Sequence, residues 1–393
     1  MAKEVVILSG ARTPFGAYGG GLINESATNL ATVATKGALA RANVDPGQVD
    51  YVVLGNVCQT SRDAIYMGRH VALKSGMKMQ TPALIVNQLC GSGVQAVVQA
   101  ANLINTDQAE VVVAGGAEAL SMTPYINWGI RWGARMGHME MWDGLDIRDT
   151  LPNASMGETA ENLREKFKID RQAQDQLALE SQQKAKAAIE AGRLAEEIVP
   201  VETKDKKGKP AVVSKDEHPR PDSTLEALGS LKPFFRKDGT VTAGNASGIV
   251  DGGSALVITT AERAGKLGVK PLSRLVSWAV AGVPPEIMGI GPVEAVPLAL
   301  KKAGLKLEDM DLIEINEAFA VQYLVVEGEL KLDRSKVNVN GGAIAIGHPF
   351  GATGGRLLLS ISLELQRRKA RYGLVSLCIG GGMGIAMIVE RVS

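Results

Sequence analysis

The chain has 393 residues with a formal net charge of +1 at pH 7, and 45% of its residues are hydrophobic and 22% charged. These values are typical of a soluble globular protein with room for two domains or one duplicated domain. They give no electrostatic case for nucleic acid or an anionic membrane as a partner, and no apolar run reaches the ~18 residues of a membrane span.

The cysteines and the first residues indicate the compartment. Cys58, Cys90 and Cys378 lie far apart, without the C-x-x-C spacing of a zinc site or the density of a disulfide framework. Residues 1–8 are too short and too acidic for a signal peptide and are typical of a first strand. We therefore expect a reducing, cytoplasmic setting and no metal.

Cys90 lies in a glycine-bracketed turn, residues 87–93, between an apolar run and a helical pattern. Residues 83–86 predict a buried strand, and the spacing of valines and alanines over 94–101 predicts a helix. Free N–H groups at a helix N-terminus favour a thiolate, the nucleophilic form of cysteine. With one nearby histidine, they could lower the thiol pKa from about 8.5 to about 7. A buried packing cysteine is an equally good interpretation.

Residues 120–242 are richer in charge and methionine than the segments on either side. Asp170 is a plausible N-cap for a helix over 171–191 that ends at Gly192. The lysine-rich stretch 204–209 is typical of a solvated turn, although it could also attract a phosphorylated ligand. This segment predicts an inserted loop domain that covers a site.

Two short polar motifs follow the inserted segment. Residues 244–248 (Gly-Asn-Ala-Ser-Gly) form a small-residue turn against which an extended ligand could lie, or a simple hinge. Asn316 follows the predicted strand 312–315, where its amide could hold a water or a substrate carbonyl, or could cap a helix.

His348 and Cys378 lie in glycine-rich segments near the end of the chain. Pro349 fixes the backbone beside His348, which suits a side chain aimed as a general base, although a structural hydrogen bond is an alternative. Cys378 ends a predicted strand, and residues 380–382 are all glycine. Their N–H groups could point into a cavity as an oxyanion hole, or the strand end could simply be packed.

The chain contains two related halves at an offset of 261 residues. The helix, turn and strand over 38–54 recur over 299–315, and the offset places Cys90 on Gly351 and Gly93 on Gly354. Strands 111–114 and 374–377 follow, with a register slip of a few residues. Chance similarity of generic α/β units is the alternative to duplication.

This alternation of strands and helices predicts an α/β fold with mostly parallel sheet, in which two halves stack as α/β/α/β/α and their strand-end loops meet. We expect residues 1–119 and 243–270 to form the first half and 271–393 the second. Residues 120–242 would be a loop domain inserted in the first half.

Together these motifs resemble the thiolase family over essentially the full length. The resemblance is carried by residues 87–93 (the nucleophile loop), 244–248 (the pantetheine turn), 316–320 (Asn-Glu-Ala-Phe-Ala), 347–349 (Gly-His-Pro) and 378–384 (Cys-Ile-Gly-Gly-Gly-Met-Gly). It implies the duplicated five-layered α/β/α/β/α thiolase fold with an inserted loop domain. It also implies an acyltransferase of the acetyl-CoA C-acetyltransferase or C-acyltransferase type.

The resemblance also implies roles for the motif residues. Cys90 would take the acyl group from a thioester, and His348 would accept its proton. Cys378 would be the base that removes the α-proton of acetyl-CoA in condensation. Asn316 would hold a water that binds the thioester oxygen together with His348. The N–H groups of Cys90 and Gly380 would form the second oxyanion hole.

For the substrate, the resemblance implies coenzyme A thioesters and no metal or redox cofactor. Arg220 would contact a phosphate of coenzyme A, and Ala243, Ser247, Ala318 and Phe319 would line its binding site. Family members are homodimers or homotetramers, so either state is expected, and fatty acid β-oxidation is a setting that fits.

Two features leave the substrate open. Ser155 stands where acetoacetyl-CoA-type members carry histidine, and residues 216–221 and 287–292 resemble 3-ketoacyl-CoA thiolases. Met288 could narrow the acyl pocket or could belong to the core. A ketoacyl synthase-like enzyme and a non-catalytic acyl-CoA or lipid-binding homologue are the alternative functions.

Overall fold

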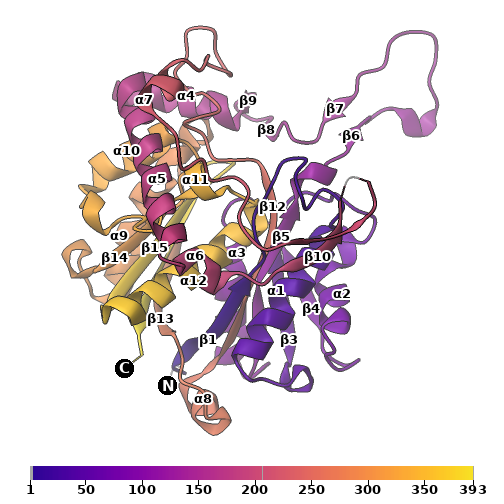
Figure 1. Cartoon of the computed structure of the whole chain (residues 1–393), viewed down its shortest axis with the longest axis vertical. Coiled ribbons are helices and arrows are strands. Elements are labelled where there is room, and N and C mark those ends of the chain that lie inside the picture. The colour runs from indigo at the N-terminus through magenta and orange to yellow at the C-terminus, as the bar shows by residue number, and fades with distance from the viewer. Residues whose placement is uncertain (1–2, 206, 393) are drawn as a thin grey trace.

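The computed structural model describes residues 3–205 and 207–392, and its main feature is a ten-stranded sheet built by these residues (Figure 1). The strand order is β14-β15-β16-β13-β1-β12-β5-β3-β4, and β2 pairs with β12 beside this path. The strands are β1 (Val5–Arg12), β2 (Gly16–Ala17), β3 (Tyr51–Gly55), β4 (Ala83–Val86), β5 (Val112–Ala119), β12 (Val250–Thr260), β13 (Ser273–Gly282), β14 (Leu312–Ile315), β15 (Tyr372–Ile379) and β16 (Met383–Arg391).

The sheet consists of two halves with the same plan. In the first half β3 runs parallel to β5, which pairs antiparallel with β12, which pairs antiparallel with β1. In the second half β14, β15, β16 and β13 repeat these three pairings in the same order. The halves meet where β1 pairs with β13 over only two residues. The topology therefore confirms the predicted duplication.

The sheet corrects two details of the sequence interpretation. Tyr51 pairs with Val112, and Leu312 pairs with Gly373, so the offset of 261 residues holds in both strands and no register slip occurs there. The prediction of a mostly parallel sheet is wrong. Among the described pairings of the main sheet only β3–β4, β3–β5 and β14–β15 are parallel. One reason is that β15 and β16 form a hairpin, and a tight turn can join only antiparallel strands.

Helices cover the outer face of each sheet half and fill the space between the two halves. Three hydrophobic clusters show this arrangement, because one contains α1, α2 and the first half, another contains α3, α12 and both halves, and the third contains α9, α10 and the second half. The predicted five-layered arrangement is confirmed. The helices are α1 (Ala27–Arg41), α2 (Met67–Lys74), α3 (Ser92–Asn105), α9 (Gly291–Ala303), α10 (Ala320–Leu330) and α12 (Phe350–Arg368).

The two central helices, α3 and α12, touch through glycines at their first turns. A Cβ atom on Gly93 would lie 2.8 Å from the carbonyl oxygen of Gly351 and 2.9 Å from the amide nitrogen of Gly354. Gly93 and Gly354 are the two positions that the 261-residue offset superimposes. Only residues without a side chain permit this backbone contact, which brings the N-terminal ends of both helices to one place.

The segment between β5 and β12 carries its own short elements. In Figure 1 the β6–β7 arm extends away from the body, whereas α4, α5 and α7 lie over the second half. Helix α5 begins and ends within one residue of the prediction, and the Asp170 side chain accepts the N–H of Ala173 at 2.7 Å as its cap. The elements are β6 (Tyr125–Ile126), β7 (Trp142–Asp143), β8 (Arg148–Asp149), β9 (Ala154–Ser155), α4 (Met156–Phe167), α5 (Arg171–Glu190), α6 (Arg193–Glu197), β10 (Val201–Lys204), β11 (Pro210–Val213) and α7 (Leu225–Gly229).

Two helices remain, α8 (Ala261–Leu267) after β12 and α11 (Ala343–Ile346) before α12. No helix in the described part of the chain is both long and apolar enough to cross a membrane. Of the predicted first strand, residues 5–8 lie in β1, whereas residues 1 and 2 lie outside the described residues. The strand predicted at 83–86 exists as β4, but it is not buried. It lies at the sheet edge, and Leu84 is 41% exposed.

Candidate active site

Cys90 lies in the turn between β4 and α3, as predicted. The turn is braced by Ser92, whose hydroxyl accepts the N–H of Gln88 at 2.8 Å and donates to the carbonyl of Leu89 at 2.7 Å. Helix α3 begins at Ser92 with Gly91 as its N-cap, so the half-buried Cys90 immediately precedes the helix terminus.

Burial dominates the ionisation of the Cys90 thiol. It raises the pKa to about 12, although hydrogen bonds from the N–H groups of Gly380 and Cys90 to the sulfur act in the opposite direction. The charge of Glu118 raises the pKa further. The pKa of Cys90 is therefore raised rather than lowered toward 7, and its thiol is neutral.

His348 lies between α11 and α12 and is fully enclosed. Its main-chain N–H donates to the carbonyl of Gly248 at 3.0 Å, and its ring Nδ1 lies 2.6 Å from the hydroxyl of Thr353. Its Nε2 lies 3.3 Å from the side-chain nitrogen of Asn316. Burial, helped by the positive charge of Arg356, lowers the pKa of His348 to about 3, so the imidazole is neutral and able to accept a proton.

Asn316 joins the histidine to the strand that carries Cys378. Its main-chain N–H donates to the carbonyl of Ser376 at 2.9 Å, two residues before Cys378. Its side-chain oxygen is buried without a hydrogen-bond partner among the described residues. Helix α10 takes Phe319 as its N-cap, so Asn316 is not a helix cap and its free oxygen can receive a water or a ligand.

Cys378 is the second-to-last residue of strand β15 and lies beside the Cys90 loop. The thiol is completely buried, and burial raises its pKa well above the ordinary value, as would a negative charge on the nearby Cys90 sulfur. A Cβ atom on Gly380 would lie 2.8 Å from the Leu89 side chain, so the glycine turn packs directly on the residue before Cys90. The structure thus brings Cys90, Cys378 and Gly380 together.

The predicted ligand turn, residues 244–248, is fixed between the other motifs rather than being a free hinge. The N–H of Ser247 donates to the carbonyl of Ala318 at 2.9 Å, and the N–H of Ala320 donates to the carbonyl of Asn245 at 2.8 Å. Gly248 is also bonded to His348, as described above. The turn therefore places Ser247 within one assembly with the Asn316 and His348 segments.

The remaining predicted contacts have different environments. Ala318 and Phe319 are buried, in an apolar cluster that also contains Cys378 and Met288. Ala243 and Arg220 are exposed. The main chain of Arg220 is fixed because its N–H donates to the side chain of Gln182 at 2.8 Å.

Glu118 is a residue of this region that sequence reasoning missed. Its carboxylate is fully buried and accepts N–H groups from Val57 at 3.0 Å, Cys58 at 3.0 Å and Gly351 at 2.8 Å. It therefore ties the loop after β3 to the start of α12, and so joins the two halves beside the thiols. A single acid in the apolar run 111–120 was the available signal.

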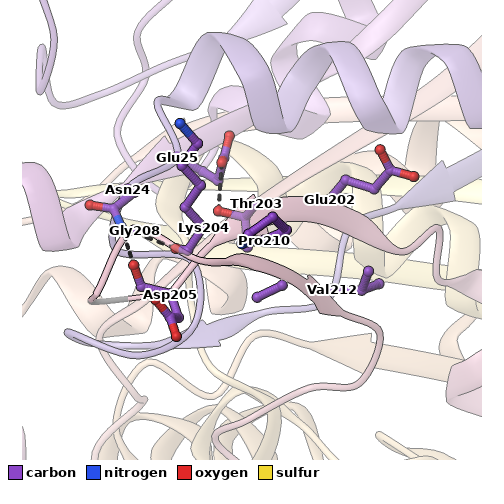
Figure 2. Close-up of a pocket in the computed structure, with 10 residues that line it drawn as sticks. Asn24, Glu25, Glu202, Thr203, Lys204, Asp205, Gly208, Pro210 and Val212 are labelled. Atoms are coloured by element: carbon purple, nitrogen blue, oxygen red, sulfur yellow. Dashed lines mark hydrogen bonds between the residues drawn. The ribbon is translucent and has the colours of Figure 1, made fainter.

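A separate open groove lies at the hairpin of β10 and β11, where Figure 2 shows its lining residues. Its volume is about 880 Å³, and none of its lining residues is a predicted site residue. Carboxylates of Glu25, Glu202 and Asp205 accompany Lys204 there, which does not favour a phosphorylated ligand. The basic stretch forms the hairpin turn, with Lys207 and Lys209 exposed, while residue 206 lies outside the described residues.

Comparisons with known proteins agree with the geometry. The chain matches the family model of the thiolase N-terminal domain over residues 5–262 and that of the thiolase C-terminal domain over residues 269–391. It is 50% identical to the mitochondrial 3-ketoacyl-CoA thiolase of Homo sapiens over 393 residues, which is 99% of each chain. It is 47% identical to the acetyl-CoA acetyltransferase of Pseudomonas aeruginosa over 392 residues, 99% of this chain and 100% of that one.

Among solved structures, the crystal structure of the human mitochondrial 3-ketoacyl-CoA thiolase in complex with CoA superposes with a TM-score of 0.96. The sequence identity is 49%, and the match covers 100% of this chain and 98% of the other.

Proposed function

The chain belongs to the thiolase family and is an acetyl-CoA acyltransferase, and from this premise we propose how its residues divide the reaction. Carbon–carbon bond formation between thioesters needs a covalent acyl carrier, a base and stabilisation of enolate charge. The assembly of two thiols, a neutral imidazole and converging N–H groups supports this division.

Acyl transfer begins at Cys90. As its sulfur attacks the thioester carbonyl, the thiol proton passes to Nε2 of His348, because both groups are neutral at rest. The N–H groups of Cys90 and Gly380 receive the developing oxyanion. When the carbonyl re-forms, the C–S bond to coenzyme A breaks, and the departing thiolate takes the proton from His348.

The second half-reaction uses Cys378. The Cys378 thiol passes its proton to the neutral imidazole of His348, and the resulting thiolate removes the α-proton of acetyl-CoA. The carbanion attacks the carbonyl of acyl-Cys90, the C–S bond to Cys90 breaks, and the released Cys90 thiolate takes the proton back from His348. In thiolysis the same steps run backwards, and Cys378 protonates the departing acetyl-CoA carbanion. While His348 carries the proton, its Nε2–H and a water held at the free oxygen of Asn316 donate hydrogen bonds to the enolate oxygen.

Coenzyme A binds over the turn 244–248 in this proposal. Ser247, Ala243, Ala318 and Phe319 contact the pantetheine arm, and Arg220 contacts a phosphate. The human relative has been solved with CoA, which supports a coenzyme A site on this scaffold. The docking of Ser247 on Ala318 supports the placement of the pantetheine arm.

The acyl chain has four carbons or more in our proposal. An apolar cluster of Met288, Ile287, Phe319 and Val321 surrounds Cys378 and offers a wall for a chain longer than acetyl. Relatives called 3-ketoacyl-CoA thiolase and acetyl-CoA acetyltransferase are about equally similar, so both substrates belong in the test.

We further propose that the protein is a homodimer or homotetramer. The open edge of β4 carries the exposed Leu84, and unpaired strand edges favour pairing with another chain. The β6–β7 arm carries exposed Trp128, Trp132 and Met136, a density of apolar side chains that favours contact with a further subunit.

The domain organisation and the cellular location also stay predictions. We propose that residues 1–119 with 243–270, residues 120–242 and residues 271–393 act as the first half, the inserted loop domain and the second half. We also propose a reducing, cytoplasmic location, supported by three cysteines that are all unpaired among the described residues. The mammalian relatives are named as mitochondrial.

The test is thiolysis of acetoacetyl-CoA and of a longer 3-ketoacyl-CoA by free coenzyme A, followed as loss of the ketoacyl absorbance. We expect turnover of both, with kcat/KM for the longer substrate at least equal to that for acetoacetyl-CoA. Cys90→Ala should lower kcat by several orders of magnitude because no acyl carrier remains. Unchanged activity in Cys90→Ala would defeat the proposal, and a protein that binds CoA without turnover would favour the non-catalytic alternative.

A substitution of Cys378 distinguishes the ketoacyl synthase-like alternative from a thiolase. Condensation that persists at the native rate after Cys378→Ala would favour that alternative over the thiolase division of roles.

A further inference from the structure

Thr353 lies directly against the proposed base and has no role in the steps above. It is completely buried in the first turn of α12, five residues after His348. Its hydroxyl oxygen is 2.6 Å from the Nδ1 atom of His348 and 3.2 Å from the carbonyl oxygen of Pro349. The pairing is thus a short, buried contact between a hydroxyl and a catalytic ring.

The neighbours of the hydroxyl define the direction of its hydrogen bonds. A carbonyl oxygen can only accept, so the carbonyl of Pro349 offers an acceptor for the single hydroxyl proton of Thr353. With its proton directed there, the hydroxyl oxygen of Thr353 accepts a hydrogen bond from the Nδ1–H group of His348. On the other side of the ring, the side-chain nitrogen of Asn316, which can only donate, lies 3.3 Å from Nε2.

We propose that Thr353 is a positioning residue that holds His348 as the Nδ1–H tautomer and so keeps Nε2 unprotonated and able to take the Cys90 proton. The inference rests on the proposed role of His348 as the base. A neutral imidazole carries its proton on one nitrogen only, and the partner of the other nitrogen selects which one. Without Thr353, the ring could present a protonated Nε2, which cannot act as a base.

The same contact acts again after proton transfer. The imidazolium donates from both nitrogens, and its Nδ1–H bond to Thr353 becomes charge-assisted. Arg356, also on α12, is the positive side chain whose field opposes this charge. Thr353 therefore stabilises His348 at the moment when it carries the proton, and it does so without touching the substrate.

The test compares two substitutions of Thr353 with a matched control. Thr353→Val keeps the shape and removes the acceptor, whereas Thr353→Ser keeps the hydroxyl. The control is Thr32→Val, because Thr32 is a buried helical threonine that bonds a carbonyl four residues earlier at 2.7 Å, as Thr353 does, but faces no histidine.

We expect Thr353→Val to lower kcat for thiolysis by about tenfold to hundredfold with KM nearly unchanged, the scale of one hydrogen bond to a charged group. Thr353→Ser should recover most of the loss, and Thr32→Val should keep the native kcat. Native kcat in Thr353→Val, a loss confined to KM, or equal loss in the serine variant would each overturn the proposal.

A second measurement needs no Thr353 variant. The chain has only four histidines, so nitrogen-15 NMR of the histidine-labelled enzyme, with His348→Asn to assign the signal, reports which ring nitrogen carries the proton. We expect protonated Nδ1 and unprotonated Nε2, and the reverse would overturn the proposal. This readout does not depend on turnover, so it remains decisive even if the enzyme fails the thiolysis assay.

Discussion

At the scale of single residues, the site works by burial rather than by ready-made charges. Enclosure raises the pKa of the Cys90 thiol to about 12 and lowers the pKa of His348 to about 3. A thiolate–imidazolium pair is therefore disfavoured at rest, and the proton moves only when the substrate arrives. The helix N-terminus that the sequence suggested as the cause of ionisation is present, but the desolvation of the sulfur outweighs it.

The raised thiol pKa predicts the pH dependence of Cys90 alkylation. Below this pKa the thiol is protonated, so the reactive thiolate fraction rises about tenfold for each pH unit. We expect the rate of carboxamidomethylation by iodoacetamide, followed on the Cys90 peptide by mass spectrometry, to rise steadily between about pH 6.5 and about pH 9. A plateau reached near pH 7 would show a stable thiolate and contradict this picture.

At the scale of elements, the site depends on the contact between α3 and α12. Their N-terminal turns meet at Gly93 and Gly354, and Glu118 ties the start of α12 to the loop after β3. Cys90 immediately precedes one of these helices and His348 the other. The close backbone contact between α3 and α12 therefore holds the Cys90 thiol and the His348 imidazole in a fixed relative position.

A substitution at this contact should cost stability. In Gly93→Ala the new methyl group meets main-chain atoms of α12 that cannot move aside, and overpacking of this kind costs about 1–3 kcal/mol. The matched control is Gly265→Ala in α8, where the added methyl meets nothing within 4 Å. Removal of a helical glycine there should stabilise the protein by about 0.5–1 kcal/mol.

Urea midpoints of the two variants and the native protein measure these changes in one experiment. Equal midpoints for Gly93→Ala and the native protein would show that the helices can separate, which contradicts the rigid contact.

At the scale of the whole molecule, two surfaces of the single chain expose groups that another subunit could cover. One is the open edge of β4, and the other is the β6–β7 arm that extends from the body in Figure 1. Exposed tryptophans at a protruding arm are costly in water, and a further subunit that covers them would remove this cost. Both surfaces support the proposed assembly as a homodimer or homotetramer.

The arm gives a direct test of assembly. We expect Trp132→Asp to shift the molar mass measured by light scattering from a tetramer toward a dimer, because a charge would be buried in the contact. Phe234→Asp is the control, since Phe234 is also highly exposed but lies outside the arm. An identical mass in all three proteins would argue against a role of the arm.

The sequence predicted the parts of the molecule that local pattern determines. The 261-residue offset revealed the duplication, and the glycine motifs indicated Cys90, His348 and Cys378 as candidate site residues because such turns are rare. The antiparallel β12 was missed because the long insertion before it hides its connection. The edge position of β4 was missed because an apolar run looks the same at an edge and in a core.

Glu118 and Thr353 were missed for a different reason. The carboxylate of Glu118 is satisfied by Gly351, which lies 233 residues away in sequence, and the hydroxyl of Thr353 by a ring whose orientation no pattern reveals. Both residues act through another residue rather than on a substrate. Side chains of this kind become visible only when the hydrogen bonds of the folded chain are known.

The central claim is that Cys90 carries the acyl group and Cys378 moves the α-proton. The most direct measurement is intact-protein mass spectrometry of Cys378→Ala after incubation with acetyl-CoA, with Cys90→Ala as the control. We expect an acetyl adduct on Cys90 of Cys378→Ala, no adduct in Cys90→Ala, and no condensation by either variant. A Cys378→Ala protein that is never acetylated, or that still condenses acetyl-CoA at the native rate, would contradict this division of roles.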